Sequence, residues 1–291
     1  MARKNIFQLL DESYDIQSEI RKINSLLCNR EYFEDNSFQH FSVVRLISIF
    51  LFEDWKYRGT CITVEEYFKR AKATINSNKK TSEDVIINNL EVIENFLKLV
   101  EDNINNLRFQ YGMDYYTDYK TVFIPLVKTL EKRMGLTARE YEDRVVLYPA
   151  NASLEKVIEL CDDVHIQWEL IRYVRENLSL SEKRKSLAYL ATNLGIEEDK
   201  AETNEHIKTL IKSADNILNN LHIRHNNKTG KWENQILDGF PEEDAIALCD
   251  MVYNEMLTIV LLREHKGYEP IYAAFREKQK ATKTKKKTES Q

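Results

Sequence analysis

The sequence predicts an all-α protein, a multi-helix bundle in two helical halves with at most one short β element near residues 144–149. Turn-forming residues are scarce, because the 291 residues include only 7 Gly and 4 Pro, whereas typical usage is roughly 7% and 5%. Apolar residues recur at helical spacing along most of the chain. A chain with so few tight turns spends its length in long elements, and here those elements should be helices.

The composition indicates a soluble, cytoplasmic protein without a membrane segment. Hydrophobic residues make up 43% and charged residues 31% of the chain, enough to bury a core. The net charge of −5 excludes a globally basic surface, so binding to nucleic acid would be local. Acidic residues interrupt the N-terminus too early for an export signal, and the most apolar run, 41–52, is too short to span a bilayer. Four widely spaced cysteines are typical of reduced intracellular thiols: Cys28, Cys61, Cys161 and Cys249.

Residues 1–112 are predicted to form an N-terminal helical domain. Apolar periodicity supports each of its helices, and a helix that is apolar nearly all round should be buried centrally. Thr63 and Glu66 have the spacing of a capping box, and Gly112 is placed to end a helix. The expected helices cover 6–27, 38–55 (the buried one), a segment opened by Thr63, and 81–110.

Residues 113–150 are expected to connect the two halves. The run Arg144–Pro149 is β-branched and ends at a proline, which predicts a strand. Four tyrosines lie just before or at the start of the region, bracketed by Arg108 and Lys120, and could stack bases. A packed joint between domains is the favoured explanation, because tyrosine suits half-buried junctions. These residues are Tyr111, Tyr115, Tyr116 and Tyr119.

Residues 151–276 are predicted to form a C-terminal helical bundle, followed by a disordered lysine-rich tail over 277–291. Ser179 and Glu182 form a second capping box, and Pro241 suits the first turn of a helix. The expected helices cover 153–177, 179–194, 197–221 and 241–265.

The segment 219–227 has the highest density in the chain of side chains that commonly act in catalysis. Metal-independent RNA cleavage needs an acid–base pair, for which histidine is the usual group, and a cation for the phosphate, for which arginine offers a bidentate fork. Amides can orient the substrate. The segment supplies these types as His222, Arg224, His225 and the asparagines Asn220, Asn226 and Asn227. The simpler alternative is that the asparagines end a helix and the cations complement its dipole.

Residues 157–262 resemble the helical domains of the HEPN superfamily (higher eukaryotes and prokaryotes nucleotide-binding). The resemblance lies in a long helix, the Asn226–Asn227 turn, and a second long helix from Pro241. It implies a four-helix bundle acting on RNA in bacterial phage defence, of the abortive-infection or toxin–antitoxin type. It further implies a homodimer with the active site at its interface, and a defence-system partner protein.

The resemblance implies a role for each residue of the segment. His225 would be the catalytic acid–base group, with His222 as an auxiliary and Arg224 on the phosphate. Asn220, Asn226 and Asn227 would bind and orient RNA. The family pattern places an arginine four to six residues before the histidine, and here Asn220 stands in that position. The alternative function is therefore a non-catalytic interaction or sensor module, or an antitoxin-like partner.

No cofactor or metal is expected. Cys161 and His165 have i, i+4 spacing on the predicted helix 153–177, but no second ligand pair accompanies them. The sequence contains no phosphate-binding loop, no dinucleotide fingerprint and no nucleophile elbow, so NTP hydrolysis, dinucleotide binding and serine-hydrolase chemistry lack support.

Overall fold

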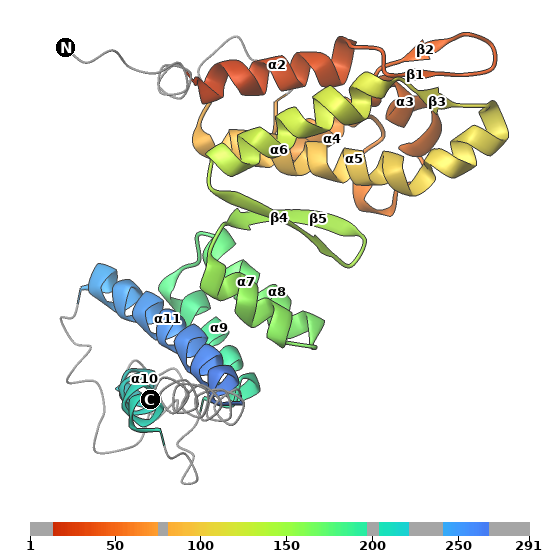
Figure 1. Cartoon of the computed structure of the whole chain (residues 1–291). Helices are drawn as coiled ribbons and strands as arrows, with labels where there is room; N and C mark the ends of the chain where they lie inside the picture. Colours follow the sequence, from red (N-terminus) through yellow and green to blue (C-terminus); the bar gives the residue numbers. More distant parts are fainter. Residues whose placement is uncertain (1–13, 75–80, 197–203, 221–240, 268–291) are drawn as a thin grey trace, which may run out of the picture. The chain divides into compact units, whose positions relative to one another are not determined.

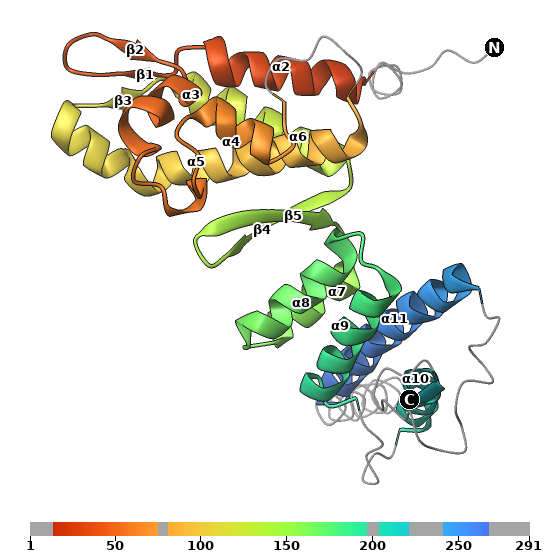
Figure 2. The same ribbon diagram turned by 180° about the vertical axis from the view of Figure 1, so that it is seen from behind.

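The computed structural model describes residues 14–74, 81–196, 204–220 and 241–267. The chain divides into two compact units, residues 1–150 and 151–291, which Figures 1 and 2 show from opposite sides. The predicted all-α class is confirmed, because the described residues are mostly helical with only two small antiparallel sheets. The predicted tail 277–291 and residues 6–13 of the first predicted helix lie outside the described residues.

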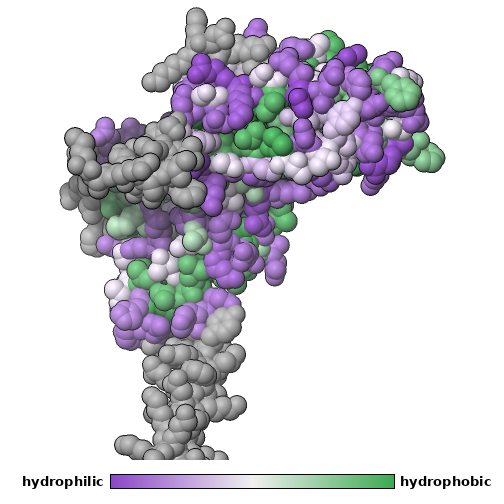
Figure 3. All heavy atoms as spheres, turned by 45° about the horizontal axis from the view of Figure 1, so that its top comes forward, coloured by the Kyte–Doolittle hydropathy of each residue, from purple (hydrophilic) through white to green (hydrophobic). Residues whose placement is uncertain are grey.

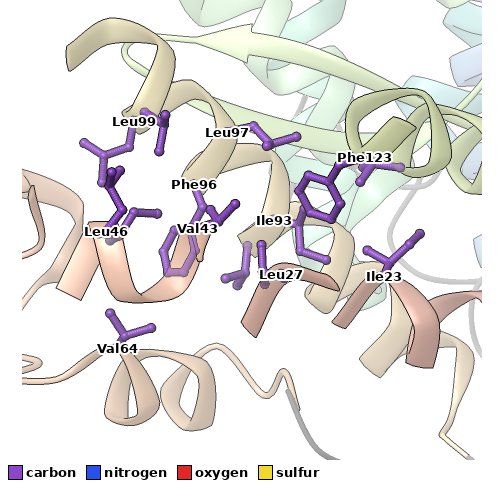
Figure 4. Close-up of a cluster of buried hydrophobic side chains, with 14 of the residues drawn as sticks. Ile23, Leu27, Val43, Leu46, Val64, Ile93, Phe96, Leu97, Leu99 and Phe123 are labelled. Carbon is purple, nitrogen blue, oxygen red and sulfur yellow. The ribbon is translucent and has the colours of Figure 1, made fainter. Parts of the chain in front are cut away.

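The first unit is built around α5 (Glu83–Tyr111). Its apolar face packs in one cluster with α2 (Ile16–Asn29), α3 (Val43–Leu46), α4 (Val64–Arg70) and α6 (Ile124–Arg133). Figure 4 shows side chains from several of these elements converging on α5. The cluster includes Ile23, Leu27, Val43, Leu46, Val64, Ile93, Phe96, Leu97, Leu99 and Phe123.

Gly112 ends α5, as the sequence predicts. It has φ +63°, and its amide donates to the Arg108 and Leu107 carbonyls. A Cβ at this position would meet the Asn36 side chain at 2.0 Å, so both the backbone conformation and the close approach require glycine. Thr63 caps α4 by accepting from the Glu66 amide, as predicted. The Glu66 carboxylate accepts from the amide of Ile62, whereas in a capping box it would accept from the amide of Thr63.

The helix predicted over residues 38–55 is wrong in its first part. A short hairpin of β1 (Phe33–Glu34) and β2 (His40–Phe41) precedes α3, and β3 (Asp114–Tyr115) completes the three-stranded sheet. The Asp35 carboxylate accepts from two backbone amides of the turn, those of Ser37 and Gln39. This local bonding competes with helix formation. Ser42 then caps α3, which continues as a π-helical segment, Ile47–Leu51.

The strand predicted over residues 144–149 is confirmed as β5 (Arg144–Pro149). It pairs antiparallel with β4 (Leu136–Tyr141), which the sequence analysis did not predict. With the three-stranded sheet, the described residues thus contain more β structure than the single element expected. The missed strand has weak alternation, with only Tyr141 fully buried. Residues 113–150 pack into the first unit, since Phe123 and Leu130 are buried in its core.

The second unit consists of α7 (Ala152–Leu160), α8 (Val164–Arg175), α9 (Leu180–Asn193), α10 (Glu205–Asn220) and α11 (Glu242–Gly267). Helix α11 packs against α7, α9 and α10. The capping box of Ser179 and Glu182 is confirmed. The single helix predicted over 153–177 is instead two helices, because the Asp163 carboxylate accepts from the His165 and Ile166 amides and starts α8.

Length and composition alone would allow α11 to cross a membrane over residues 242–265, but a core helix of a soluble protein passes the same test. In the second unit α11 buries Cys249, Val252 and Met256 fully. The face visible in Figure 3 is mostly hydrophilic, with separate apolar patches. Large exposed apolar side chains include Phe38 and Phe109 of the first unit and Val164 and Met251 of the second.

Candidate functional site

Five of the six predicted site residues lie outside the described residues, namely His222, Arg224, His225, Asn226 and Asn227. The sixth, Asn220, is the last residue of α10. The structure therefore describes the two helices that flank the predicted site. The chain leaves α10 at Asn220 and enters α11 at Glu242.

These two flanking helices pack on each other. Helix α10 buries Ile207, Ile211, Ala214 and Leu218. One polar contact crosses between the helices, where the Ser213 hydroxyl donates to Glu255 Oε1 over 2.8 Å. Burial raises the pKa of Glu255, and the Ser213 hydrogen bond partly offsets this rise.

A cleft of about 690 Å³ lies in the first unit. One wall is α5, and the other runs from β3 into α6, with Glu140 and Val145 of the β4–β5 hairpin beside them. A volume of this size suits a small molecule. Tyr115 and Tyr119, together with the bracketing Arg108 and Lys120, line this cleft within the first unit.

Two buried carboxyl groups lie close together beside the cleft. Glu94 of α5 lines it and is 6% exposed, and Glu131 of α6 is 4% exposed. Lys128 bridges them, with its Nζ 2.7 Å from Glu94 Oε2 and 3.2 Å from Glu131 Oε2. If both groups are ionised, the Oε1 atoms of Glu94 and Glu131 have no hydrogen-bond donor. A proton held between the two groups would supply one.

The surroundings favour that proton. Burial, followed by the hydrogen bond and charge of Glu94, raises the pKa of Glu131 to about 8, and Lys128 only partly opposes the shift. Burial disfavours the charged form of Lys128, but its two carboxyl partners outweigh burial and raise its pKa. Two like charges in one buried site cannot both be accommodated cheaply. A neutral Glu131 therefore sits beside Glu94 at neutral pH.

The other cations around the cleft are already occupied. Lys98 lies 3.0 Å from Asp102 and 2.8 Å from Glu140, and its side chain is 17% exposed. Arg108 is paired with Asp114 at 3.0 Å. Lys120 stands over the Tyr115 ring, 5.0 Å from its centroid. Burial raises the pKa of Tyr119, as do the nearby charges of Glu101 and Glu94.

The carboxyl pair of Glu94 and Glu131 could not be predicted from the sequence, because the two residues lie on different helices. A signal was present, since Glu94 falls within the apolar face formed by Ile93, Phe96 and Leu97, all buried. A charged residue on such a face has to find a partner or a proton. Which partner it finds depends on α6 packing across α5, and spacing along the chain does not reveal that packing.

The second unit holds a smaller polar cluster. Asp250 of α11 accepts from the Tyr173 hydroxyl at 3.0 Å and from Lys183 at 2.5 Å. Lys183 also lies over the Tyr173 ring, which stacks on Tyr253 with centroids 4.3 Å apart. Burial and then Asp250 raise the pKa of Tyr173. These contacts join α8, α9 and α11, so the cluster is a clamp between helices.

Cys161 and His165 do not lie on one helix, as the predicted helix 153–177 would have placed them. Cys161 ends α7 and His165 lies in the first turn of α8. Within the described residues, no group of three or more His, Cys, Asp or Glu side chains is placed to share a metal ion. Burial, with Asp162 and Asp163, raises the pKa of the Cys161 thiol, which makes it a poorer thiolate ligand.

No family model, curated protein or solved structure matches this chain. Arguments about its function therefore depend on its own residues. Two places are of interest: the segment between α10 and α11, and the cleft of the first unit.

Proposed function

We propose that the chain is an RNA-directed effector of the HEPN type, whose second unit presents the segment 219–227 to RNA from a homodimer. One observation supports this most: the segment follows a long helix, α10, and precedes a second long helix, α11, that packs against it. Two helices packed in this way fix the positions of both ends of the intervening segment. His225 then acts as the acid–base group and Arg224 binds phosphate.

The cross-helix contact of Ser213 with Glu255 supports a fixed geometry for this pair of helices. A catalytic constellation needs a rigid base, because small displacements of acid–base groups cost large factors in rate. In a two-fold dimer each member of the segment would occur twice. His222 would assist, and Asn220, Asn226 and Asn227 would orient the RNA strand.

The test uses purified full-length protein with total RNA. The substitution His225→Ala should slow RNA cleavage by about 10²- to 10⁴-fold, the usual contribution of an acid–base group. Arg224→Ala should weaken cleavage through loss of the phosphate contact. His206→Ala is the matched control, because His206 is an exposed histidine on α10 outside the segment, and it should leave cleavage unchanged. Equal RNA integrity with all four proteins would remove the catalytic proposal.

A non-catalytic role is the second candidate, and one observation favours it. Asn220, the last residue of α10, stands where the family pattern has an arginine. In this case the segment ends a helix and clamps a dimer, which would act as a sensor or as an antitoxin-like partner. His225→Ala and Arg224→Ala would then lower the melting temperature or dissociate the dimer. Light scattering and thermal unfolding distinguish this outcome from loss of catalysis with the fold and mass unchanged.

A further inference from the structure

The cleft of the first unit has more acceptors than its own donors satisfy. Its lysines and its arginine are engaged by carboxylates or by a tyrosine ring, as described above. An anionic ligand would have to break these contacts. On the acidic side, Glu101 lines the cleft and has no ion-pair partner among the described residues. Glu94 lines it too, is more than nine-tenths buried, and leaves Oε1 without a donor.

The spacing of these two acids is set by the helix. Glu94 and Glu101 are seven residues apart on α5, which is two turns or about 10 Å along the axis. They consequently lie on one face of α5. The side chains that line the cleft around them include an apolar set, which consists of Leu97, Val100, Ile104, Ile124 and Val145. The site therefore combines an acid at its base, an acid at its rim and hydrocarbon surface along its length.

We propose that this cleft binds a linear organic dication, with one guanidinium or ammonium head donating to Glu94, an alkyl chain on the apolar side chains, and the second head at Glu101. The buried head donates to Glu94 in place of the proton that Glu131 holds in the free protein. Charge-assisted hydrogen bonds are about twice as strong as neutral ones, and burial of the alkyl chain adds a hydrophobic contribution. The site belongs to the first unit and does not depend on the proposed RNA chemistry of the second.

Binding of the cation should release a proton. Below pH 8 the free protein holds a proton on Glu131, whose pKa is about 8. A cationic head at Glu94 replaces this proton as the donor and favours the ionised form of Glu131. Lys128 contacts the pair directly. The other charged and titratable groups that line the cleft with Glu94 are Lys98, Glu101, Asp102, Arg108, Tyr115, Tyr119, Lys120 and Glu140. Affinity should rise as the pH rises from 6 to 8.

The test is calorimetric titration of the full chain with agmatine, whose ends are a guanidinium and an ammonium group. N-carbamoylputrescine is the matched ligand, because a neutral urea replaces the guanidinium. We expect saturable one-to-one binding of agmatine and at least about tenfold weaker binding of the urea analogue. Titrations at pH 7 in buffers of different ionisation enthalpy should show release of a proton.

Glu94→Gln should weaken agmatine binding by about tenfold or more, and Glu101→Gln by a smaller factor. Glu83→Gln is the control, because Glu83 is an exposed residue in the first turn of α5, and it should bind as the wild type does. If Glu94→Gln fails to fold, the affinity of Glu101→Gln for agmatine and the comparison of agmatine with N-carbamoylputrescine still test the proposal. No binding at millimolar agmatine, equal binding of both ligands, or unchanged affinity in Glu101→Gln together with a folded Glu94→Gln would overturn the proposal.

His225→Ala separates this inference from the proposed function. The variant should lose RNA cleavage and bind agmatine normally. Loss of agmatine binding with intact RNA cleavage in Glu94→Gln would show that the two sites are independent. A protein that cleaves no RNA but binds agmatine would retain this inference and refute only the proposed function.

Discussion

Helices α5 and α11 use their polar residues differently. Each is the longest helix of its unit, with 29 and 26 residues. Three polar side chains of α5, those of Asn89, Glu91 and Asn95, bond to the backbone of Thr74 and of strand β5. In α11, Asp250 and Glu255 bond to side chains of other helices, while Tyr253 and Arg263 donate to backbone carbonyls. Strand β5 packs against α5, whereas the main described neighbours of α11 are helices.

Three residues illustrate the role of α5. Asn89 is buried, accepts from the Thr74 amide and donates to the Thr74 carbonyl. Asn95 makes the same two-way contact with Val145 of β5, over 2.7 and 2.9 Å. Glu91 accepts from the Leu147 amide at 3.0 Å. Buried backbone groups need partners, and in a chain so poor in turn formers the long helix supplies them.

The largest expected effect comes from removing one of these contacts. Asn95→Ala leaves both the amide and the carbonyl of Val145 without their side-chain partner, so we expect a loss of about 2–4 kcal/mol in the free energy of unfolding of the first unit. Urea denaturation, followed by circular dichroism, measures it. Asn103→Ala is the matched control, because Asn103 bonds only within α5, to the Leu99 carbonyl. Equal losses in the two variants would contradict this role for α5.

The second prediction concerns pH. In the folded protein the pKa of Glu131 is raised from 4.5 to about 8, so between these values the folded state binds more protons than the unfolded state. The contribution of the Glu131 proton to the free energy of unfolding is therefore complete below about pH 4.5. It declines as pH rises towards 8, by at most about 1.4 kcal/mol per pH unit. Thermal unfolding at pH 5 and pH 8 should show this decline.

Glu131→Gln sharpens the pH prediction. The glutamine amide replaces the proton as a donor towards Glu94 and does not titrate, so the variant should lose most of the dependence between pH 5 and pH 8. Glu83→Gln should keep the wild-type dependence. A slope unchanged by Glu131→Gln would mean that another group titrates in this range.

The smallest expected effect lies in the helix clamp of the second unit. Asp250→Asn weakens the contacts with Tyr173 and Lys183, but the Asp250 side chain is 46% exposed, so solvent screens the ion pair. We expect a loss of about 1 kcal/mol, measured by urea denaturation. Tyr173→Phe removes only the hydroxyl and keeps the ring stacked on Tyr253, which separates the hydrogen bond from the packing. A loss larger than that of Asn95→Ala would reverse the comparison of the two helices.

Local signals in the sequence predicted local features. The stop at Gly112, the capping box at Ser179 and the strand ending at Pro149 depend on neighbours within a few residues. Two other local signals were overridden by apolar periodicity, which predicted continuous helices there. The hairpin before α3 arises where the Asp35 side chain captures turn amides. The break between α7 and α8 depends on Asp163, whose capping role competes with a continuous apolar pattern.

The two candidate sites differ in how far apart their residues lie in the sequence. The segment 219–227 is conspicuous in the sequence because its groups are adjacent, and its proposed role depends on that density and on the flanking helices. The carboxyl pair is inconspicuous, because Glu94 and Glu131 are ordinary helical residues when considered alone. Only the packing of α6 on α5 brings them to one buried point with Lys128 between them.

Composition and local patterns predict a helical protein, the ends of most of the described helices, and the segment that concentrates histidine, arginine and asparagine. Helix periodicity, caps and stops act over one or two turns, so they can be read from neighbouring residues. The tertiary structure decided which polar groups are buried, which carboxyl holds a proton and where a cleft forms. Burial and charge proximity depend on segments far apart in the chain, and these two quantities determine the pKa of Glu131.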